Sequence, residues 1–278
     1  MIAANPAELG ELEAMRDLFA ACPPESAAEL GVAVSEIAGA VCISLRAAQR
    51  SAMFNRVLGL GLATAPTEQD VEAIDAFYRK LGVDYCVALA PEARPPELRE
   101  WLTRRRLSPA YRWAKFRRRA GDPPIVETAL RLERVGRDRA ADFARVFVCA
   151  YETPAFFEPW VAELPGRKDW HCYVAYAGHE PAATGALYMA ERVGWLGMAA
   201  TMPKHRRKGA QNAILAARIE AAADEGCDLV VTETGALAEG RPSNSYRNIQ
   251  RAGFEFAYER DNYLSSPNAD TSGTRSSK

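Results

Sequence analysis

The stretch from Pro203 to Gln211 carries the clearest chemical signal in the sequence. It lies between an apolar segment and a long segment rich in Ala, Leu and Ile. We expect a strand, a loop and the first turn of a helix here, so that free backbone N–H groups and the helix dipole converge on one point. Gly209 lacks the Cβ that would hold an anion away from the backbone. Arg206, Arg207 and Lys208 add positive charge, and the whole pattern suits a pyrophosphate.

A basic helix N-terminus on a solvated face is the alternative interpretation of this loop. Cations at the positive end of a helix dipole are unfavourable unless an anion compensates them. The sequence therefore favours the anion site.

The segment from residue 170 to about residue 263 resembles the GNAT superfamily of N-acetyltransferases. Its members share a strand, an Arg/Gln-x-x-Gly-x-Gly/Ala loop and a helix. Arg206, Gly209 and Gln211 occupy the three motif positions. Gln211 departs from the small residue usually found at its position, whereas the first glycine is present.

A second motif supports the resemblance. Residues 244–248 read Asn-Ser-Tyr-Arg-Asn and lead to Ala252-Gly253-Phe254. They are similar to the superfamily's asparagine-bearing helix that ends in Gly-Phe. The resemblance implies that Asn244 and Asn248 contact the cofactor.

The resemblance also implies a cosubstrate and a mechanism. Acetyl-CoA, or another short acyl-CoA, would place its pantetheine arm along strand 193–201, which splays apart from strand 228–234. A strand N–H would polarise the acyl carbonyl, and a neutral amine would attack it directly. The arm would pair with the backbone of Ala199, Ala200 and Thr201. The pyrophosphate would lie on Arg206, Arg207, Lys208, Gly209, Ala210 and Gln211.

Direct attack requires an acceptor for the amine proton and a donor for the leaving thiolate. The superfamily often has a tyrosine four residues before the glycine of Gly-Phe, where this chain has Ile249. Tyr246 is the substitute candidate for the acid, and a core-facing tyrosine on a short helix is its equally good structural interpretation. Glu233, near the end of an apolar strand, is the candidate base. A rim carboxylate paired with an arginine is the alternative for Glu233, and a water chain could accept the proton instead.

The two halves of the chain follow one plan. Residues 61–66 parallel residues 197–203, and a helix is expected after each. Gly82-Val83-Asp84 parallels Gly226-Cys227-Asp228, and each opens an apolar strand. After Pro66, however, the first half has no glycine and carries two carboxylates at the helix start, which would repel a pyrophosphate.

The predicted fold is α/β, with two GNAT-like domains in tandem, each a mixed, mostly antiparallel sheet flanked by helices. Thr67 and Asp70 form a capping-box pattern, and Asp138 is the expected cap of the next half's first helix. Residues 1–124 form a degenerate GNAT-like domain without the cofactor loop, 125–264 an acyl-CoA-binding domain, and 265–278 a disordered tail. Helices are expected at 6–21, 67–81, 95–106, 138–150, 210–225 and 245–251. Strands are expected at 39–45, 54–63, 84–90, 110–116, 127–135, 170–176, 182–190, 193–201, 228–234 and 254–263.

Composition limits the classes of function. The 278 residues suit one large domain or two ordinary ones, and a net charge of −1 gives no general attraction to nucleic acid or membrane. Between Tyr111 and Arg117 we expect a strand with aromatic residues on one face and cations on the other, instead of a nucleic-acid surface. The six scattered cysteines have no metal spacing, so we expect no metal, reduced thiols and a cytoplasmic location. Neither a signal peptide nor a membrane span is visible.

The leading prediction is an N-acetyltransferase that transfers the acetyl group from acetyl-CoA to a small-molecule or peptide amine. A non-catalytic acyl-CoA-binding sensor is the alternative, and the first half could instead recruit a partner. The stretch from Tyr151 to Trp160, with Phe156 and Phe157, is expected either to line the acceptor pocket or to pack in the core. The sequence predicts neither the acceptor, nor the acyl-chain length, nor the oligomeric state.

Overall fold

The computed structural model describes residues 5–237 and 240–265, and the chain divides into two compact units. Among the described residues, the first unit holds Ala28–Arg112 and the segment from Arg260 onward. The second unit holds the residues up to Ala27 together with Trp113–Glu259, so two strands described below, Leu107–Arg119 and Glu255–Ser265, have residues in both units. The units are thus interleaved along the chain, which differs from the boundary between residues 124 and 125 that the sequence predicts.

The first unit contains a mixed sheet with the strand order β1-β2-β3-β4-β11. All neighbours are antiparallel except β3 and β4, whose parallel pairing requires the crossover helix α3. A helix α4 follows β4. The bounds are β1 (Val32–Ile37), β2 (Ala40–Leu45), β3 (Arg56–Leu58), α3 (Glu68–Leu81), β4 (Cys86–Leu89), α4 (Leu98–Arg104) and β11 (Glu255–Ser265).

Helix α3 begins as the sequence predicts. The Thr67 hydroxyl accepts a hydrogen bond from the Asp70 N–H, and the Asp70 carboxylate accepts one from the Thr67 N–H at 2.7 Å. Glu68 lies in the same first turn and is contacted by the guanidinium of Arg104 at 2.8 Å. The N-terminus of α3 therefore already holds carboxylates, which satisfy the helix dipole within the protein.

The second unit contains the strand order β5-β10-β9-β8-β7-β6, in which only β9 and β10 are parallel. Helix α7 makes the crossover between them. The bounds are α1 (Pro6–Ala20), β5 (Leu107–Arg119), β6 (Arg131–Val135), α5 (Ala140–Tyr151), α6 (Phe157–Val161), β7 (Trp170–Ala177), β8 (Glu180–Ala190), β9 (Val193–Thr201), α7 (Ala210–Asp224), β10 (Leu229–Gly235) and α8 (Asn244–Arg251). The predicted α/β fold, with a mixed and mostly antiparallel sheet flanked by helices, is confirmed.

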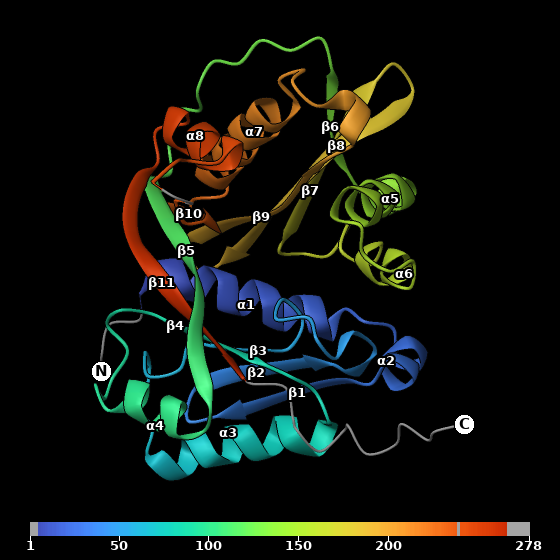
Figure 1. Ribbon diagram of the computed structural model, residues 1–278. Coiled ribbons are helices and arrows are strands. Elements are labelled where there is room, and N and C mark those ends of the chain that lie inside the picture. Colours follow the sequence, from blue (N-terminus) through green and yellow to red (C-terminus); the bar gives the residue numbers. More distant parts are fainter. Residues whose placement is uncertain (1–4, 238–239, 266–278) are drawn as a thin grey trace. The chain divides into compact units, whose positions relative to one another are not determined.

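Helices cover both faces of the second sheet (Figure 1). A Cβ built on Gly194 of β9 would lie 3.2 Å from Ala222 of α7, so this residue faces α7. The next residue, Trp195, faces the opposite side, because its Cβ lies 3.2 Å from the position of a Cβ on Gly10 of α1. The N-terminal helix α1 therefore belongs to the core of the second unit.

The two units share an order of elements. Strands β1, β2 and β3 are antiparallel neighbours followed by α3 and the parallel strand β4, and strands β7, β8 and β9 are followed in the same way by α7 and β10. Gly82 and Gly226 follow the two crossover helices and both have a positive φ, at 67° and 79°. Residues 61–66 follow β3, whereas residues 197–201 lie within β9, and a crossover helix comes after each segment.

Some local predictions are wrong. Asp138 lies in a single 3-10 turn (Arg137–Arg139) and does not cap α5, which has no side-chain cap. The strand expected over 54–63 is confined to β3, and β1, α6 and the short helix α2 (Pro24–Leu30) are not predicted. Of the expected disordered tail, Ser265 is the last residue of β11 and residues 266–278 lie outside the described residues.

Candidate active site

The basic loop precedes the first turn of α7, as the sequence predicts. Gly209 is the N-cap residue with φ 79°, a conformation that favours glycine, and no side chain caps the helix. A Cβ at Gly209 would lie 3.2 Å from the Glu127 carbonyl oxygen. Thr128 donates its hydroxyl to the Lys208 carbonyl at 2.9 Å. Residues 127 and 128, which precede β6, thus pack against the basic loop, and a side chain at position 209 would disturb this packing.

Positive charge in this loop remains available to a ligand. Arg206, Arg207 and Lys208 are exposed, and neither arginine forms an ion pair with a described residue. Lys204, one turn earlier, pairs with Glu180 of β8, and this contact lowers the pKa of that carboxyl. Free helix N–H groups and unpaired guanidinium groups at one place form an anion site.

Strands β9 and β10 diverge beside the loop, as the resemblance implies. Their parallel pairing covers only Val193–Trp195 against Leu229–Val231, although β9 continues to Thr201 and β10 to Gly235. At the next position the Thr232 hydroxyl donates to the Leu196 carbonyl at 2.8 Å, so a side chain replaces the backbone ladder. The opposite edge of β10 pairs with β5 along its whole length. The β9 edge beyond Trp195 is therefore free of strand pairing with β10.

Strand β9 bulges within this diverging segment. Thr184 pairs with Ala200 and Ala186 pairs with Gly197, so that Met198 and Ala199 together oppose the single residue Gly185. Met198 has φ 53°, which is a sparsely populated conformation for a residue with a side chain. Bulges of this kind re-aim backbone groups and recur next to active sites.

Side chains from three elements hold the carbonyl groups of the bulge. Arg218 of α7 donates to the Gly197 carbonyl at 3.0 Å and Thr184 of β8 to the Met198 carbonyl at 3.2 Å. Tyr151, the last residue of α5, donates to the Ala199 carbonyl at 3.0 Å, and Gln211 donates to the Ala200 carbonyl at 2.7 Å. Backbone conformation at the bulge is thus fixed by contacts that a sequence motif does not show.

The contacts of the Gln211 side chain explain how the site accommodates a glutamine where the motif usually has a small residue. Its side chain turns back onto β9, where the amide also contacts the Thr201 hydroxyl at 2.8 Å. The side chain is therefore directed at the strand, and Gln211 has only its backbone N–H to offer an anion.

Arg218 lies buried below the bulge. Its guanidinium also donates to the carbonyls of Ala186 and Ile214, and it forms no ion pair with a carboxylate among the described residues. Burial lowers the pKa of Arg218 to about 10. Arg218 is not among the residues that the sequence predicts for the site, and its one signal in the sequence is its place on the apolar face of an Ala- and Ile-rich helix.

Glu233 lies within a buried cluster of charges. Its carboxylate contacts the Lys115 ammonium at 2.9 Å and the Trp195 indole N–H at 3.0 Å, and its side chain is 7% exposed. The same ammonium contacts Glu11 of α1 at 2.8 Å. One cationic partner of Glu233 is thus a lysine of β5. The predicted facing of β5 is wrong at Lys115, which is fully buried, because both faces of this strand are covered here.

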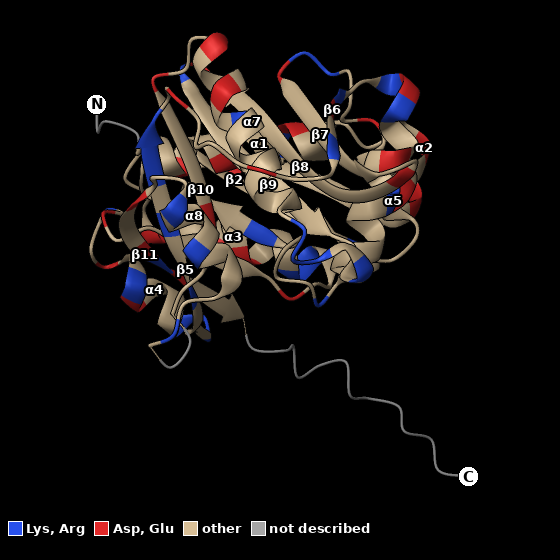
Figure 2. Ribbon diagram, turned by 90° about the horizontal axis from the view of Figure 1, so that it is seen from above, with Lys and Arg blue, Asp and Glu red and all other residues tan. Residues whose placement is uncertain are grey.

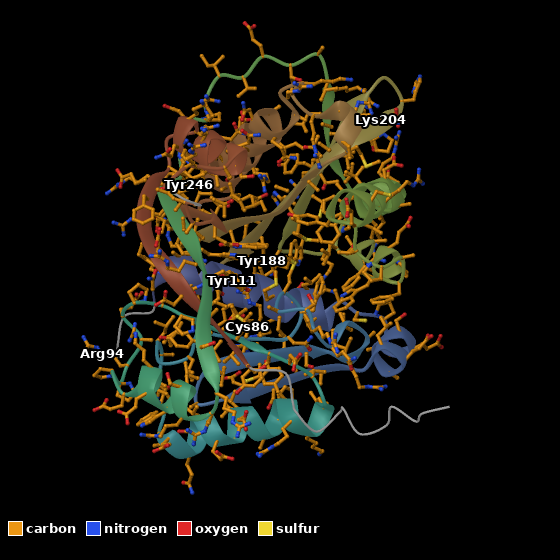
Figure 3. The ribbon with its side chains drawn as sticks, in the orientation of Figure 1. Cys86, Arg94, Tyr111, Tyr188, Lys204 and Tyr246 are labelled. Carbon is orange, nitrogen blue, oxygen red and sulfur yellow. The ribbon has the colours of Figure 1, made fainter. Side chains whose placement is uncertain are left out.

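The residues predicted on α8 have different environments. Tyr246, which Figure 3 labels, is buried, and its ring packs edge-on against Phe116 with centroids 4.8 Å apart. Its hydroxyl makes no hydrogen bond with a described residue. Asn244 is exposed and Asn248 half-buried in the same helix, and Ile249, at the position of the missing tyrosine, is buried.

The aromatic stretch after α5 divides between the core and the surface. Phe157 and Trp160 are buried and stack with centroids 5.5 Å apart, and the Trp160 indole donates to the Leu18 carbonyl of α1. Phe156 is half-buried, whereas Tyr151 is 40% exposed. For Phe157 and Trp160 the core interpretation is confirmed.

Other classes of site have little support in the described residues. Figure 2 shows positive and negative segments interspersed along the ribbon. No three His, Cys, Asp or Glu side chains among the described residues gather as metal ligands. In the same part of the chain, no helix has the length and apolar character needed to cross a membrane.

Comparison with known proteins agrees with this geometry. Residues 140–239 match the model of the acetyltransferase (GNAT) family, and these residues run from α5 through the basic loop to β10. The chain therefore contains a GNAT acetyltransferase domain, a domain that supports acyl transfer. No curated protein sequence matches the chain.

Solved structures similar to this chain share its fold. A GCN5-related N-acetyltransferase from Kribbella flavida is 16% identical, with a TM-score of 0.65, over 97% of this chain and 98% of that one. One from Sphaerobacter thermophilus is 15% identical, with a TM-score of 0.58, over 94% and 93%. A tandem GNAT protein from the clavulanic acid biosynthesis pathway is 15% identical, with a TM-score of 0.52, over 77% and 75%.

Proposed function

We propose that this protein transfers an acyl group, in the first instance acetyl, from acyl-CoA to the amine of a small molecule or peptide. The observation that carries the proposal is the divergence of β9 from β10 next to the uncapped start of α7. A diverging strand pair offers backbone groups to an extended arm, and the helix N-terminus offers N–H groups to a pyrophosphate. The extended arm and the pyrophosphate are both parts of CoA, so the two features together suit this cosubstrate.

The cofactor contacts follow from this arrangement. The pyrophosphate binds the exposed basic side chains of the loop and the N–H groups of Gly209, Ala210 and Gln211. Since the Ala199 and Ala200 carbonyls already accept hydrogen bonds from side chains, the pantetheine arm pairs chiefly with N–H groups at Ala199–Thr201. The first turn of α8, with Asn244 and Asn248, borders the same cofactor.

Glu233 accepts the amine proton in this proposal. The Lys115 ammonium contacts both Glu233 and Glu11, so the ammonium keeps Glu11 as a carboxylate partner after Glu233 takes up a proton. Lys115 and Trp195 also fix the carboxylate, which a proton acceptor needs if it is to meet the attacking amine in one geometry. Tyr246 is the acid that the sequence predicts, and its ring packs within the apolar core around Phe116.

The first unit binds no acyl-CoA in this proposal and acts as a degenerate GNAT-like unit. The carboxylates of Glu68 and Asp70 occupy the start of α3, where the second unit has its basic loop. One acyl-CoA therefore binds per chain. None of the six cysteines, all within the described residues, forms a disulfide bond, which fits a cytoplasmic enzyme whose thiols stay reduced.

A non-catalytic acyl-CoA sensor is the second candidate. The observation that favours it is the buried position of Tyr246 together with an isoleucine at position 249. The two functions differ in one product, since only the enzyme releases free thiol in an amine-dependent reaction.

The test is calorimetric titration of acetyl-CoA into the full chain and into two double variants. Arg206→Glu/Arg207→Glu reverses two charges of the loop and should weaken binding at least about tenfold. Arg50→Glu/Lys80→Glu makes the same charge change at exposed positions of the first unit and should bind like the wild type. No binding to the folded wild type, or two molecules per chain, would contradict the proposal.

Turnover is then measured as thiol release over a panel of small-molecule and peptide amines. Amine-dependent release identifies an enzyme. Tight one-to-one binding without any release would favour the sensor.

A further inference from the structure

Tyr151 brings a phenol to the diverging segment of β9. It is the last residue of α5, its ring lies 4.7 Å from that of Phe147, and its hydroxyl donates to the Ala199 carbonyl at 3.0 Å. Ala199 lies in the bulge and beyond Trp195, the last β9 residue that pairs with β10. The phenol therefore lies where the proposed acyl group would meet the strand.

The surroundings of Tyr151 suit a proton donor. Burial of the phenol raises the pKa of Tyr151 to about 12, with the Arg218 charge lowering this pKa and the Glu233 charge raising it. The phenol is thus protonated at neutral pH. The residue as a whole is nevertheless 40% exposed, so solvent reaches part of its side chain.

Tyr246, in contrast, belongs mostly to the core. It is 8% exposed and packs among apolar residues of α7, α8 and β5. A proton donor has to lie within hydrogen-bond reach of the sulfur atom, directly or through one water.

We propose that Tyr151 is the general acid that protonates the departing CoA thiolate. This inference rests on the acyltransferase function proposed above. It gives Tyr151 the role of proton donor, because the α8 motif has Ile249 in place of the usual tyrosine.

The proton balance closes within the site. The amine nitrogen attacks the acyl carbon, forming the C–N bond, while the carbonyl electron pair moves to oxygen and an amine proton moves to Glu233. The C=O bond then re-forms and the C–S bond breaks, with its electron pair going to sulfur. The Tyr151 proton passes to that sulfur and gives free thiol. Water carries the proton from Glu233 to the tyrosinate, which restores both residues.

The experiment compares two acyl donors with Tyr151→Phe, which keeps the ring and removes the hydroxyl. Hydroxylamine serves as the acceptor, and uncatalysed reaction is subtracted. With acetyl-CoA, kcat should fall by about 100-fold or more, because an alkyl thiolate needs protonation as it leaves. With 4-nitrophenyl acetate, whose leaving group departs as a stable anion, kcat should stay within about threefold of the wild type.

Two further variants separate catalysis from structure. Tyr176→Phe removes a phenol hydrogen bond to Asp142 of the same helix α5, at 2.9 Å, and should leave turnover of both donors unchanged. Tyr151→Phe should keep most of its acetyl-CoA affinity in calorimetry, because the basic loop is unchanged and Arg218, Thr184 and Gln211 still hold the other carbonyls of the bulge.

The outcomes are distinguishable. Equal losses with both donors would mean that Tyr151 acts only structurally. A donor-selective loss in Tyr246→Phe with none in Tyr151→Phe would move the role to α8. Either result overturns the assignment while the acyltransferase function stands, whereas failure of the wild type to bind acetyl-CoA overturns that function itself.

Discussion

Replacing Lys115 by Met tests the buried charge cluster behind Glu233. The ammonium is 0% exposed and contacts two carboxylates, Glu11 at 2.8 Å and Glu233 at 2.9 Å, whose side chains are 2% and 7% exposed. Removing one partner of a buried ion pair costs about 3–5 kcal/mol, because the remaining charge stays desolvated. We expect Lys115→Met to lower the free energy of unfolding by about that amount, although Met fills a similar volume.

The measurement is urea unfolding of the wild type, Lys115→Met and two controls. Glu11→Gln removes one of the two negative charges and keeps the ammonium, so it should cost less than Lys115→Met. The double variant Lys115→Met/Glu11→Gln should regain part of the loss, because one fewer negative charge stays buried without the ammonium. These differences isolate the electrostatic part of the effect.

We also expect Lys115→Met to change the rate of acyl transfer. Lys115→Met should lower kcat, because Glu233 loses a contact that orients it, while acetyl-CoA affinity changes little. A Lys115→Met protein within about 1 kcal/mol of the wild type would refute the electrostatic argument. A double variant less stable than the sum of its parts would refute it independently.

Three further predictions follow from other parts of the molecule. Thr67→Ala removes the α3 capping box and should cost about 1 kcal/mol in chemical denaturation, whereas Thr234→Ala, at the end of β10, should not affect α3. Hydrogen bonds from the Thr67 backbone N–H and hydroxyl lower the pKa of Asp70. The ionised carboxylate therefore stabilises the fold above its unfolded pKa of about 3.8, and this stabilisation is lost as pH falls below that value. Asp70→Asn should remove this acid-sensitive contribution to the free energy of unfolding, as a pH series of unfolding measurements would show. A general acid works only below its own pKa, and that of Tyr151 is about 12, so kcat with acetyl-CoA should show no descending limb up to about pH 10, and a clear decline near pH 8 would contradict the assignment.

The elements that local chemistry determines were predicted from the sequence. The strand over 193–201, the helix after Gly209 and the capping box at Thr67 each depend on neighbouring residues, and all three form as expected. The divergence of the two parallel strands follows from the motif that resembles the GNAT superfamily. At Asp138 local reasoning failed, because a 3-10 turn takes the place of the expected cap.

The surroundings of the candidate site could not be predicted in this way. Lys115 and Glu11 are 104 positions apart, and Tyr151 meets Ala199 across 48 positions. No periodicity or spacing rule joins residues at such separations. A lysine between aromatic residues reads as a surface cation on pattern alone, because the pattern does not show that β5 is covered on both faces. Gln211 likewise looks like a defect in the motif until its contact with β9 is known.

The interleaving of the chain gives the N-terminal segments a direct role in the candidate site. Strand β5 pairs with one full edge of β10, and Lys115 of β5 supplies the ammonium that contacts Glu233 of β10. Helix α1 supplies the second carboxylate of the cluster and accepts the Trp160 indole N–H through the Leu18 carbonyl. A fragment from Glu127 onward lacks both elements, leaving the β10 edge unpaired and the α1-facing surface of the sheet uncovered. Such a fragment should stay unfolded or aggregate, as circular dichroism and size exclusion would show. A folded, active fragment would mean that Lys115 and Glu11 are dispensable and that the proton acceptor is not the cluster around Glu233.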